Sequence, residues 1–249
     1  MKNQYIPTIK KQVTEIDVGE NIAFVHPFIR PNNYKGAAKE ILNHPVRMSL
    51  PNGEKTSYLL KAVYCGPEDF QKEPEAVELR DEIMKQKYLW IFQRNLWVPE
   101  EYESSHGVFV VYDEKGVGIS KELDIGELEK ALKGGRRLEN GVRFSEDGKV
   151  SFAPRKSYKD GEMTAEEFAN DGFIIASCEE NGARNLAEVS QSKYFPIKEP
   201  RSWIVNTDNK PIQTISALGD RVWYGYGLDF GGSYRVVGRY GCASGVVVV

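Results

Sequence analysis

The sequence predicts an α+β fold in which short helices and strands are interleaved irregularly and joined by long loops. Helix starts are indicated where Asp, Thr or Ser is followed three residues later by Glu, a spacing that can cap a helix. Strands are indicated where apolar residues alternate with polar ones, or run together between turn residues. Both patterns recur from Met1 to Gly219.

The stretch from Met1 to Cys65 mixes short apolar runs such as IAFV with Pro and Asn. This pattern indicates short strands and loops around one brief helix near Ala37 to Leu42. Between Pro74 and about Phe92, apolar residues follow an imperfect helical spacing, and Pro74 suits a first turn. The residues of this stripe are Val77, Ile83, Met84, Leu89 and Trp90. We expect the longest helix of the chain here.

Signals in the middle of the chain are clearer. HGVFVVYD, residues 106–113, is rich in β-branched and aromatic residues and predicts a strand. Asp124, with Glu127 three residues later, predicts a helix over 125–133 that ends at a left-handed Gly134. VRFSEDGKVSF alternates apolar and polar residues around a Ser-Glu-Asp-Gly turn, so it predicts a hairpin.

Two further capping boxes follow. Thr164 is paired with Glu167, and Ser177 with Glu180. They bracket the apolar run GFIIA, which we expect to be a strand. The body of the chain is therefore expected to be α+β.

Composition excludes several classes of protein. The net charge is −3 and no basic run exceeds a dipeptide, so we expect no nucleic-acid binding. The N-terminal stretch MKNQYIPTIKKQVTEIDVGE is too polar for a signal peptide, and no apolar run reaches the length of a membrane-spanning helix. We therefore expect a soluble chain without membrane insertion, cytoplasmic or virion-associated, the location being left open. Three widely spaced cysteines, Cys65, Cys178 and Cys242, do not form a disulfide framework or a zinc motif.

Catalytic motifs are also missing. His26, His44 and His106 lack the spacing of metal ligands. No G-x-S-x-G occurs, and the glycines of ENGARN and KGGRR fit turns and helix ends better than phosphate-binding loops. Clustered carboxylates such as Glu166 and Glu167 fit a solvated face. We expect no enzyme activity, no metal and no cofactor.

The C-terminal segment from Asp220 to Val249, DRVWYGYGLDFGGSYRVVGRYGCASGVVVV, differs from the rest. Seven of the 23 glycines fall here, and Tyr is enriched too. Regularly placed apolar residues remain between them, so the segment is expected to fold, with Val246 to Val249 forming a buried strand. Antibody binding sites use the same Tyr, Gly and Ser, because Tyr gives rigid contact area at low entropic cost. A Gly-rich hairpin that serves only packing is the alternative.

Five residue types are absent from part of this segment. Between Tyr224 and Ser244 there is no Lys, Glu, Gln, Trp or Met, although these types together are common in the rest of the chain. They are the types that cannot be encoded when the first two bases of a codon vary freely and the third is a pyrimidine. Asn codons that are randomised at both adenines give this restricted set.

The C-terminal segment, DRVWYGYGLDFGGSYRVVGRYG followed by ASGVVVV, resembles the variable region of a target protein of a diversity-generating retroelement. KYLWIFQRNLWVPE, GVFVVYDE and FIIASCEENGARNLAEVSQ are similar to archaeal members of this group, of the nanoarchaeal kind. The resemblance implies a C-type lectin-like fold of the formylglycine-generating-enzyme type. It also implies a ligand-binding protein whose variable region is diversified by mutation of adenines during reverse transcription.

The resemblance further implies a division of labour within one domain, residues 1–249, whose variable region covers about 220–249. Leu228, Phe230, Ala243 and Val246 to Val248 would belong to the scaffold. The residues implied for the binding face are Tyr224, Tyr226, Asp229, Gly231, Gly232, Ser233, Tyr234, Arg235, Arg239, Tyr240, Cys242 and Ser244.

Two activities known from related folds are not expected. Formylglycine-generating enzymes use a cysteine pair, whereas Cys242 has no cysteine near it in the sequence. Calcium-dependent lectins need six to eight oxygen ligands, whereas the segment offers only Asp220 and Asp229. We therefore expect a monomer that binds a protein or another macromolecular surface. The alternative is a structural or virion protein that uses the Gly- and Tyr-rich segment to associate with itself.

Overall fold

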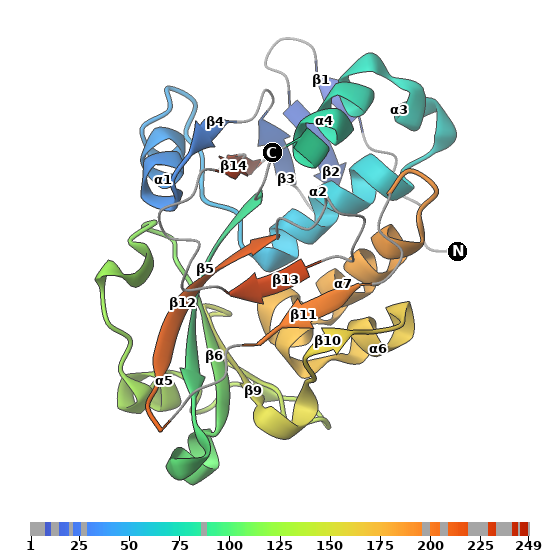
Figure 1. Ribbon diagram of the computed structural model, residues 1–249. Helices are drawn as coiled ribbons and strands as arrows, with labels where there is room; N and C mark the ends of the chain where they lie inside the picture. The colour runs from blue at the N-terminus through green and yellow to red at the C-terminus, as the bar shows by residue number, and fades with distance from the viewer. Residues whose placement is uncertain are drawn as a thin grey trace.

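The computed structural model describes residues 8–10, 15–19, 22–25, 29–85, 89–195, 200–204, 209–218, 229–232, 241–243 and 245–248. Within these ranges, strands form a large sheet of eleven strands and a small sheet of four, with helices packed on both faces of the large sheet (Figure 1). The α+β class is therefore confirmed. Every helix in the described ranges is too short or too polar to cross a bilayer.

The large sheet is mostly antiparallel. Its main path runs β10-β11-β13-β12-β5-β6-β9-β8-β7, and β14 joins β4 to β5 beside that path. The strands are β4 (Ile29–Asn32), β5 (Leu89–Val98), β6 (Gly107–Tyr112), β7 (Arg136–Arg137), β8 (Arg143–Phe144), β9 (Val150–Pro154), β10 (Gly161–Glu162), β11 (Arg201–Trp203), β12 (Ile212–Leu218), β13 (Asp229–Gly232) and β14 (Gly241–Ala243).

The small sheet has the order β1-β2-β3-β15. It joins the two ends of the described chain, because β15 pairs antiparallel with β3. Its strands are β1 (Thr8–Lys10), β2 (Glu15–Gly19), β3 (Ile22–Val25) and β15 (Val246–Val248). The expected strand over 246–249 is confirmed for its first three residues, while Val249 lies outside the described ranges.

Most helices pack on the two faces of the large sheet, whereas α3 and α4 pack on α2 (Figure 1). They are α1 (Tyr34–Leu42), α2 (Gly53–Cys65), α3 (Glu68–Lys72), α4 (Pro74–Lys85), α5 (Ile125–Ala131), α6 (Ala165–Asn170) and α7 (Gly172–Gln191). Short 3-10 turns are η1 (Glu100–Ser105), η2 (Gly118–Ser120) and η3 (Arg155–Ser157).

Strand β5 shows how the layers divide, since its successive side chains point to opposite faces. Leu89, Ile91 and Trp97 belong to the core that contains α2, α6 and α7. Trp90 belongs to a second cluster with α1, and Leu96 to a third beside α5. All ten residues of β5 are buried, so the strand is sandwiched between layers.

Two helix predictions based on capping are confirmed. The Asp124 side chain accepts a hydrogen bond from the Glu127 N–H at 2.9 Å, and α5 begins one residue after Asp124. Thr164 and Glu167 form a complete capping box at the start of α6. Helix α5 ends two residues before the predicted boundary, and Gly134 follows with the predicted positive φ of 84°. The strand at 107–112 and the β8–β9 hairpin are confirmed as well.

Three predictions are wrong at long apolar runs. The helix from Pro74 ends at Lys85, and Leu89 and Trp90 lie in β5 instead. GFIIA begins α7 and is helical, and α2, at 13 residues, is longer than α4, at 12. Apolar runs buried on all sides do not show which periodicity applies, so partners distant in the sequence decide between helix and strand.

The Ser177–Glu180 capping box is also wrong. Ser177 lies inside α7, buried, and its hydroxyl has no hydrogen-bond partner within the described ranges. The helix is interrupted two residues later instead, at Glu179, where φ is 58° and ψ is 174°. Sequence patterns also failed to predict α2, whose start is capped by Asn52 through a hydrogen bond from Lys55 N–H at 3.0 Å. Helix α1, by contrast, lies where it was expected.

A buried carboxylate precedes α7. The Asp171 side chain accepts hydrogen bonds from the backbone N–H groups of Phe173, Ile174 and Lys159, at 3.0 to 3.1 Å. Asp171 is only 5% exposed. Burial raises the pKa of its carboxyl to about 6, although the three N–H groups act in the opposite direction.

This raised pKa predicts a pH dependence of stability. Because the folded state holds the proton of Asp171 more tightly than the unfolded chain, the contribution is fully present below about pH 4 and is lost as the pH rises through about 6. A pKa difference of about two corresponds to about 3 kcal/mol. Asp171→Asn keeps a capping oxygen but does not titrate. Between pH 4 and pH 7, the free energy of unfolding of the wild type, measured with urea, should therefore fall by about 3 kcal/mol relative to that of this variant. Parallel pH profiles of the two proteins would contradict the assignment.

Candidate binding site

The described parts of the C-terminal segment are three short strands that complete the two sheets (Figure 1). Strand β13 lies between β11 and β12, β14 lies between β4 and β5, and β15 lies beside β3. Strand β13 thus pairs with the two strands that precede it in the chain, whereas β14 and β15 pair with segments far away in the sequence. The segment is part of the scaffold at these three places.

Strand β13 is held on both sides. It runs parallel to β11, with Ser202 opposite Phe230, and antiparallel to β12, with Ser216 opposite Gly232. A strand with two neighbours leaves no open edge, so its backbone groups are paired on both sides. Asp229, Gly231 and Gly232, three of the residues predicted for the binding face, therefore have their backbones inside the large sheet.

The support beneath β12 is a buried polar cluster. Asn95 Nδ2 donates to Ser216 Oγ at 3.0 Å, and Trp97 Nε1 donates to Thr214 Oγ1 at 3.0 Å. All four side chains are 1% exposed or less. Because burying an unpaired polar group costs about 1–3 kcal/mol, these bonds fix the register of β5 against β12. That register in turn places β12 for pairing with β13.

Strands β14 and β15 join the C-terminal segment to the part of the chain that precedes Pro51. Val246 exchanges two backbone hydrogen bonds with Ser49, at 2.8 and 3.0 Å, and pairs with Phe24 on its other side. Val246 is 1% exposed. A Cβ at Gly245 would lie 2.2 Å from Sδ of Met48, so this position needs Gly for close packing.

The predicted binding residues are thus distributed in two groups. Four of them lie in described strands: Asp229, Gly231 and Gly232 in β13, and Cys242 in β14. The other eight, Tyr224, Tyr226, Ser233, Tyr234, Arg235, Arg239, Tyr240 and Ser244, lie outside the described residues. The same holds for the predicted scaffold residue Leu228, whereas Phe230 and Ala243 lie in β13 and β14.

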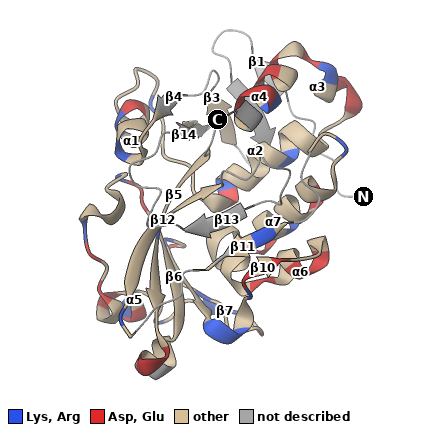
Figure 2. Ribbon diagram, viewed as in Figure 1, with Lys and Arg blue, Asp and Glu red and all other residues tan. Residues whose placement is uncertain are grey.

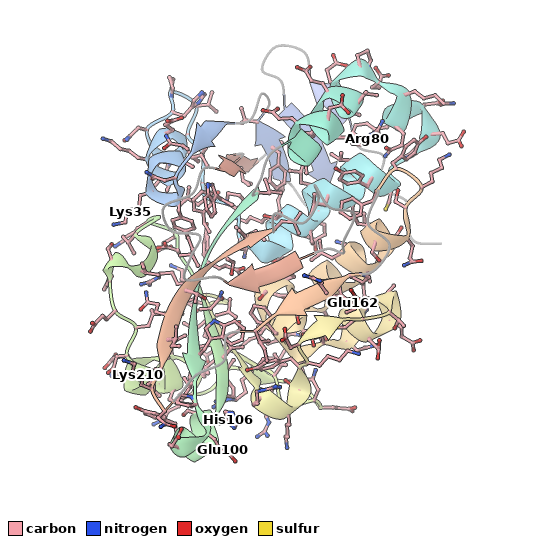
Figure 3. The ribbon with its side chains drawn as sticks, in the orientation of Figure 1. Lys35, Arg80, Glu100, His106, Glu162 and Lys210 are labelled. Carbon is pink, nitrogen blue, oxygen red and sulfur yellow. The ribbon has the colours of Figure 1, made fainter. Side chains whose placement is uncertain are left out.

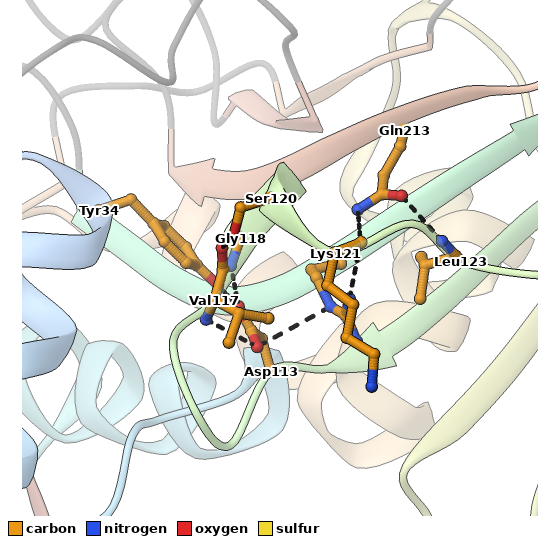
Figure 4. A network of polar contacts seen from close by, with 9 residues as sticks. Tyr34, Asp113, Val117, Gly118, Ser120, Lys121, Leu123 and Gln213 are labelled. Carbon is orange, nitrogen blue, oxygen red and sulfur yellow. Dashed lines mark hydrogen bonds and ion pairs between the residues drawn. The ribbon is translucent and has the colours of Figure 1, made fainter.

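A buried carboxylate network surrounds Asp113, the residue that follows β6 (Figure 4). Asp113, which is 2% exposed, accepts hydrogen bonds from Gly118 N–H at 2.6 Å, Val117 N–H at 3.1 Å and the Tyr34 hydroxyl at 3.1 Å. Nε of Arg94 lies 3.8 Å from its Oδ1. Burial, followed by the adjacent carboxylate, raises the pKa of Tyr34 well above its usual value. The hydroxyl therefore stays protonated and donates, so the network holds a turn in place.

Cys65 and Cys178 are not activated as nucleophiles by their surroundings. Burial raises the pKa of the Cys65 thiol to about 11 and that of Cys178 well above its usual range, so neither is a thiolate at neutral pH. His44 Nδ1 accepts a hydrogen bond from Val46 N–H at 3.2 Å. Among the described residues, no three His, Cys, Asp or Glu side chains converge in a way that could hold a metal ion.

These features define an α+β protein whose C-terminal segment completes both sheets. No family model and no curated protein matches the sequence. The chain is similar to a solved structure described as accommodation of massive sequence variation in Nanoarchaeota by the C-type lectin fold. The identity is 14%, the TM-score is 0.45, and the match covers 89% of this chain and 99% of the other.

Proposed function

We propose that the chain is a single-domain, non-enzymatic binding protein with a C-type lectin-like fold, whose binding face is built from residues 220–249. The observation that carries this proposal is the division of the segment. Residues 229–232, 241–243 and 246–248 are paired strands, whereas the four tyrosines lie between or before them, at positions 224, 226, 234 and 240. Scaffold and contact residues would then alternate along the chain, which allows side chains to vary without changing strand pairing.

The ligand class that we propose is a macromolecular surface, in keeping with the composition of the segment. A dozen candidate positions would form a broad face, of the order of the roughly 800 Å² that one partner contributes to a standard interface. A small ligand without a charged group needs a deep and mainly apolar pocket, for which Gly, Ser and Arg are poor building material. Tyrosines would be the anchors of such a face, and arginines would steer it toward acidic partners.

The proposed origin of the diversity is mutation at adenines by a retroelement. It is supported by the absence of Lys, Glu, Gln, Trp and Met between Tyr224 and Ser244. A reverse-transcriptase gene should then lie near the coding sequence, together with a near-copy of this segment that differs at adenines. A genomic neighbourhood that lacks both would contradict the retroelement origin but leave the binding proposal standing.

Replacing the four tyrosines at 224, 226, 234 and 240 with Ser should weaken binding to a macromolecular partner by at least about a hundredfold, because two or more anchors of about 2 kcal/mol would be lost. The partner would be identified first by screening the wild-type protein against host-surface extracts, and the affinity then measured by biolayer interferometry. A metabolite library is screened in parallel, to test the alternative that the ligand is a small molecule.

Tyr102→Ser is the matched control, since Tyr102 is 43% exposed and lies outside the segment. It should leave affinity within about twofold. Thermal melts should show that both variants remain folded, with changes of about 1 kcal/mol or less for each exposed tyrosine. The proposal would be overturned if the variant with all four tyrosines replaced still bound a metabolite selectively and had lost no macromolecular partner. Concentration-dependent self-association that the replacement abolishes would favour a structural protein instead.

A further inference from the structure

A pocket of about 560 Å³ lies where the β7–β8 turn, the residues that precede β6 and the η3 turn come together. Four cationic side chains, Arg137, Arg143, Arg155 and Lys156, line it together with His106, against the single carboxylate of Glu139 among the described lining residues. Figure 2 shows Lys and Arg gathered on β7 and on the turn after β9, and Figure 3 places His106 at the same end of the sheet. The chain as a whole is acidic, with a net charge of −3.

Two of the four cations are held by the protein itself. The guanidinium of Arg143 donates to both carboxylate oxygens of Glu129, at 2.8 and 2.9 Å, and lies over the Phe152 ring at 4.5 Å. Arg155 donates to the Tyr158 carbonyl at 2.9 Å. These contacts fix both guanidinium groups at the pocket wall and leave part of their donor capacity unused.

The other two cations, Arg137 and Lys156, are not held by contacts of this kind. Within the described ranges, neither Arg137 nor Lys156 makes an ion pair or a side-chain hydrogen bond, and both are exposed. When Glu129 and Glu139 are set against the four cations, two positive charges remain uncompensated. Like charges that converge in one cavity repel each other, and a bound anion would offset that repulsion.

The frame of the pocket is rigid. Gly141 has a φ of 88°, which favours glycine, and the adjacent Val142 N–H donates to Asn140 Oδ1 at 3.1 Å. Arg155 N–H donates to the His106 carbonyl at 3.1 Å. These contacts join separate segments of the frame before any ligand arrives, and Arg143 and Arg155 are already held at the wall, which lowers the entropic cost of binding.

This pocket is distinct from the C-terminal strands. Strand β14 meets β5 at Leu89, the first residue of β5. The pocket lies at the other end, where Val98 pairs with Gly107 and Gly107 with Pro154. The length of β5 separates the two ends by about 30 Å. A ligand in the pocket would not touch β14.

We propose that this pocket binds the phosphate or sulfate ester group of a compact ligand, in addition to the macromolecular contacts of the C-terminal segment. A tetrahedral oxyanion accepts hydrogen bonds from several directions, which suits Arg137, Lys156 and the held guanidinium groups of Arg143 and Arg155. The volume lies within the range of pockets for small ligands. Pro154, which lies in the wall and is half-buried, offers apolar surface for the body of the ligand.

The test is isothermal titration calorimetry of the full chain with four probes: glucose 6-phosphate, glucose 6-sulfate, inorganic phosphate and glucose. At least one of the two esters should bind, and glucose should not. Which ester binds more tightly shows whether the natural ligand is phosphorylated or sulfated. Arg137→Gln combined with Lys156→Gln should weaken ester binding by at least about tenfold. Affinity should also fall as salt is added.

The matched control removes two other exposed cations, by Lys35→Gln combined with Lys115→Gln. Lys35 lies on α1, far from His106 in Figure 3. This variant should bind the ester within about twofold of the wild type. No binding of either ester to the wild type, equal weakening in both double variants, or glucose binding as tight as the ester would each overturn the proposal.

Discussion

Replacing Asp113 with Ala should lower the free energy of unfolding by about 3–5 kcal/mol, the cost of removing one partner from a buried ion pair. The change removes the acceptor of the Tyr34 hydroxyl and of two backbone N–H groups. It also leaves Arg94, whose side chain is 10% exposed, without its counter-charge. Urea denaturation followed by tryptophan fluorescence measures the loss, since Trp90 and Trp97 both lie in the buried strand β5.

The neighbouring residue gives the control for this measurement. Glu114 forms an ion pair with Lys149 at 2.8 Å, but both side chains are about half exposed. Glu114→Ala should therefore cost about 1 kcal/mol or less. A loss below about 1 kcal/mol for Asp113→Ala would mean that the turn after β6 is held by something other than this carboxylate.

Replacing Phe173 with Ala should cost a similar amount, about 3–5 kcal/mol, for a different reason. Phe173 is 0% exposed, and its ring centroid lies 4.9 Å from that of Trp97 and 6.2 Å from that of Tyr158. The deletion would leave a cavity between the start of α7 and the large sheet. Differential scanning calorimetry should show a clear fall in melting temperature.

An exposed apolar residue serves as the comparison for Phe173. Val77 on α4 is 39% exposed, so Val77→Ala deletes apolar atoms where no cavity forms. Its effect should stay within about 0.5 kcal/mol. If Phe173→Ala and Val77→Ala had the same melting temperature, Phe173 would not be the packing centre that its contacts indicate.

Local chemistry could be predicted from the sequence, and long-range pairing could not. The caps at Asp124 and Thr164 join atoms within one helical turn, so spacing alone is sufficient to predict them. The apolar runs at 89–98 and 172–176 are buried against segments far away in the sequence. Such runs fit a strand or a helix equally well until their partners are known.

The candidate sites follow the same rule. The tyrosines and glycines after Asp220 form a contiguous segment, so composition alone marks them as candidates. The cations of the pocket come from three separate parts of the chain, at Arg137, Arg143 and the pair Arg155–Lys156. Each part by itself fits a turn or a strand end. Only the pairing of β7, β8 and β9 brings them together.

The pairing of β15 with β3 makes the small sheet depend on two parts of the chain that are far apart in the sequence. These strands come from opposite ends of the described chain, and contacts between segments so far apart in sequence form late in folding. A chain that stops before Asp229 lacks β13, β14 and β15, so strands β3, β11 and β12 each lose a neighbour. Unpaired strand edges promote aggregation and expose the chain to degradation. Removal of residues 229–248 is therefore expected to destabilise both sheets at once, because each sheet contains strands from this segment.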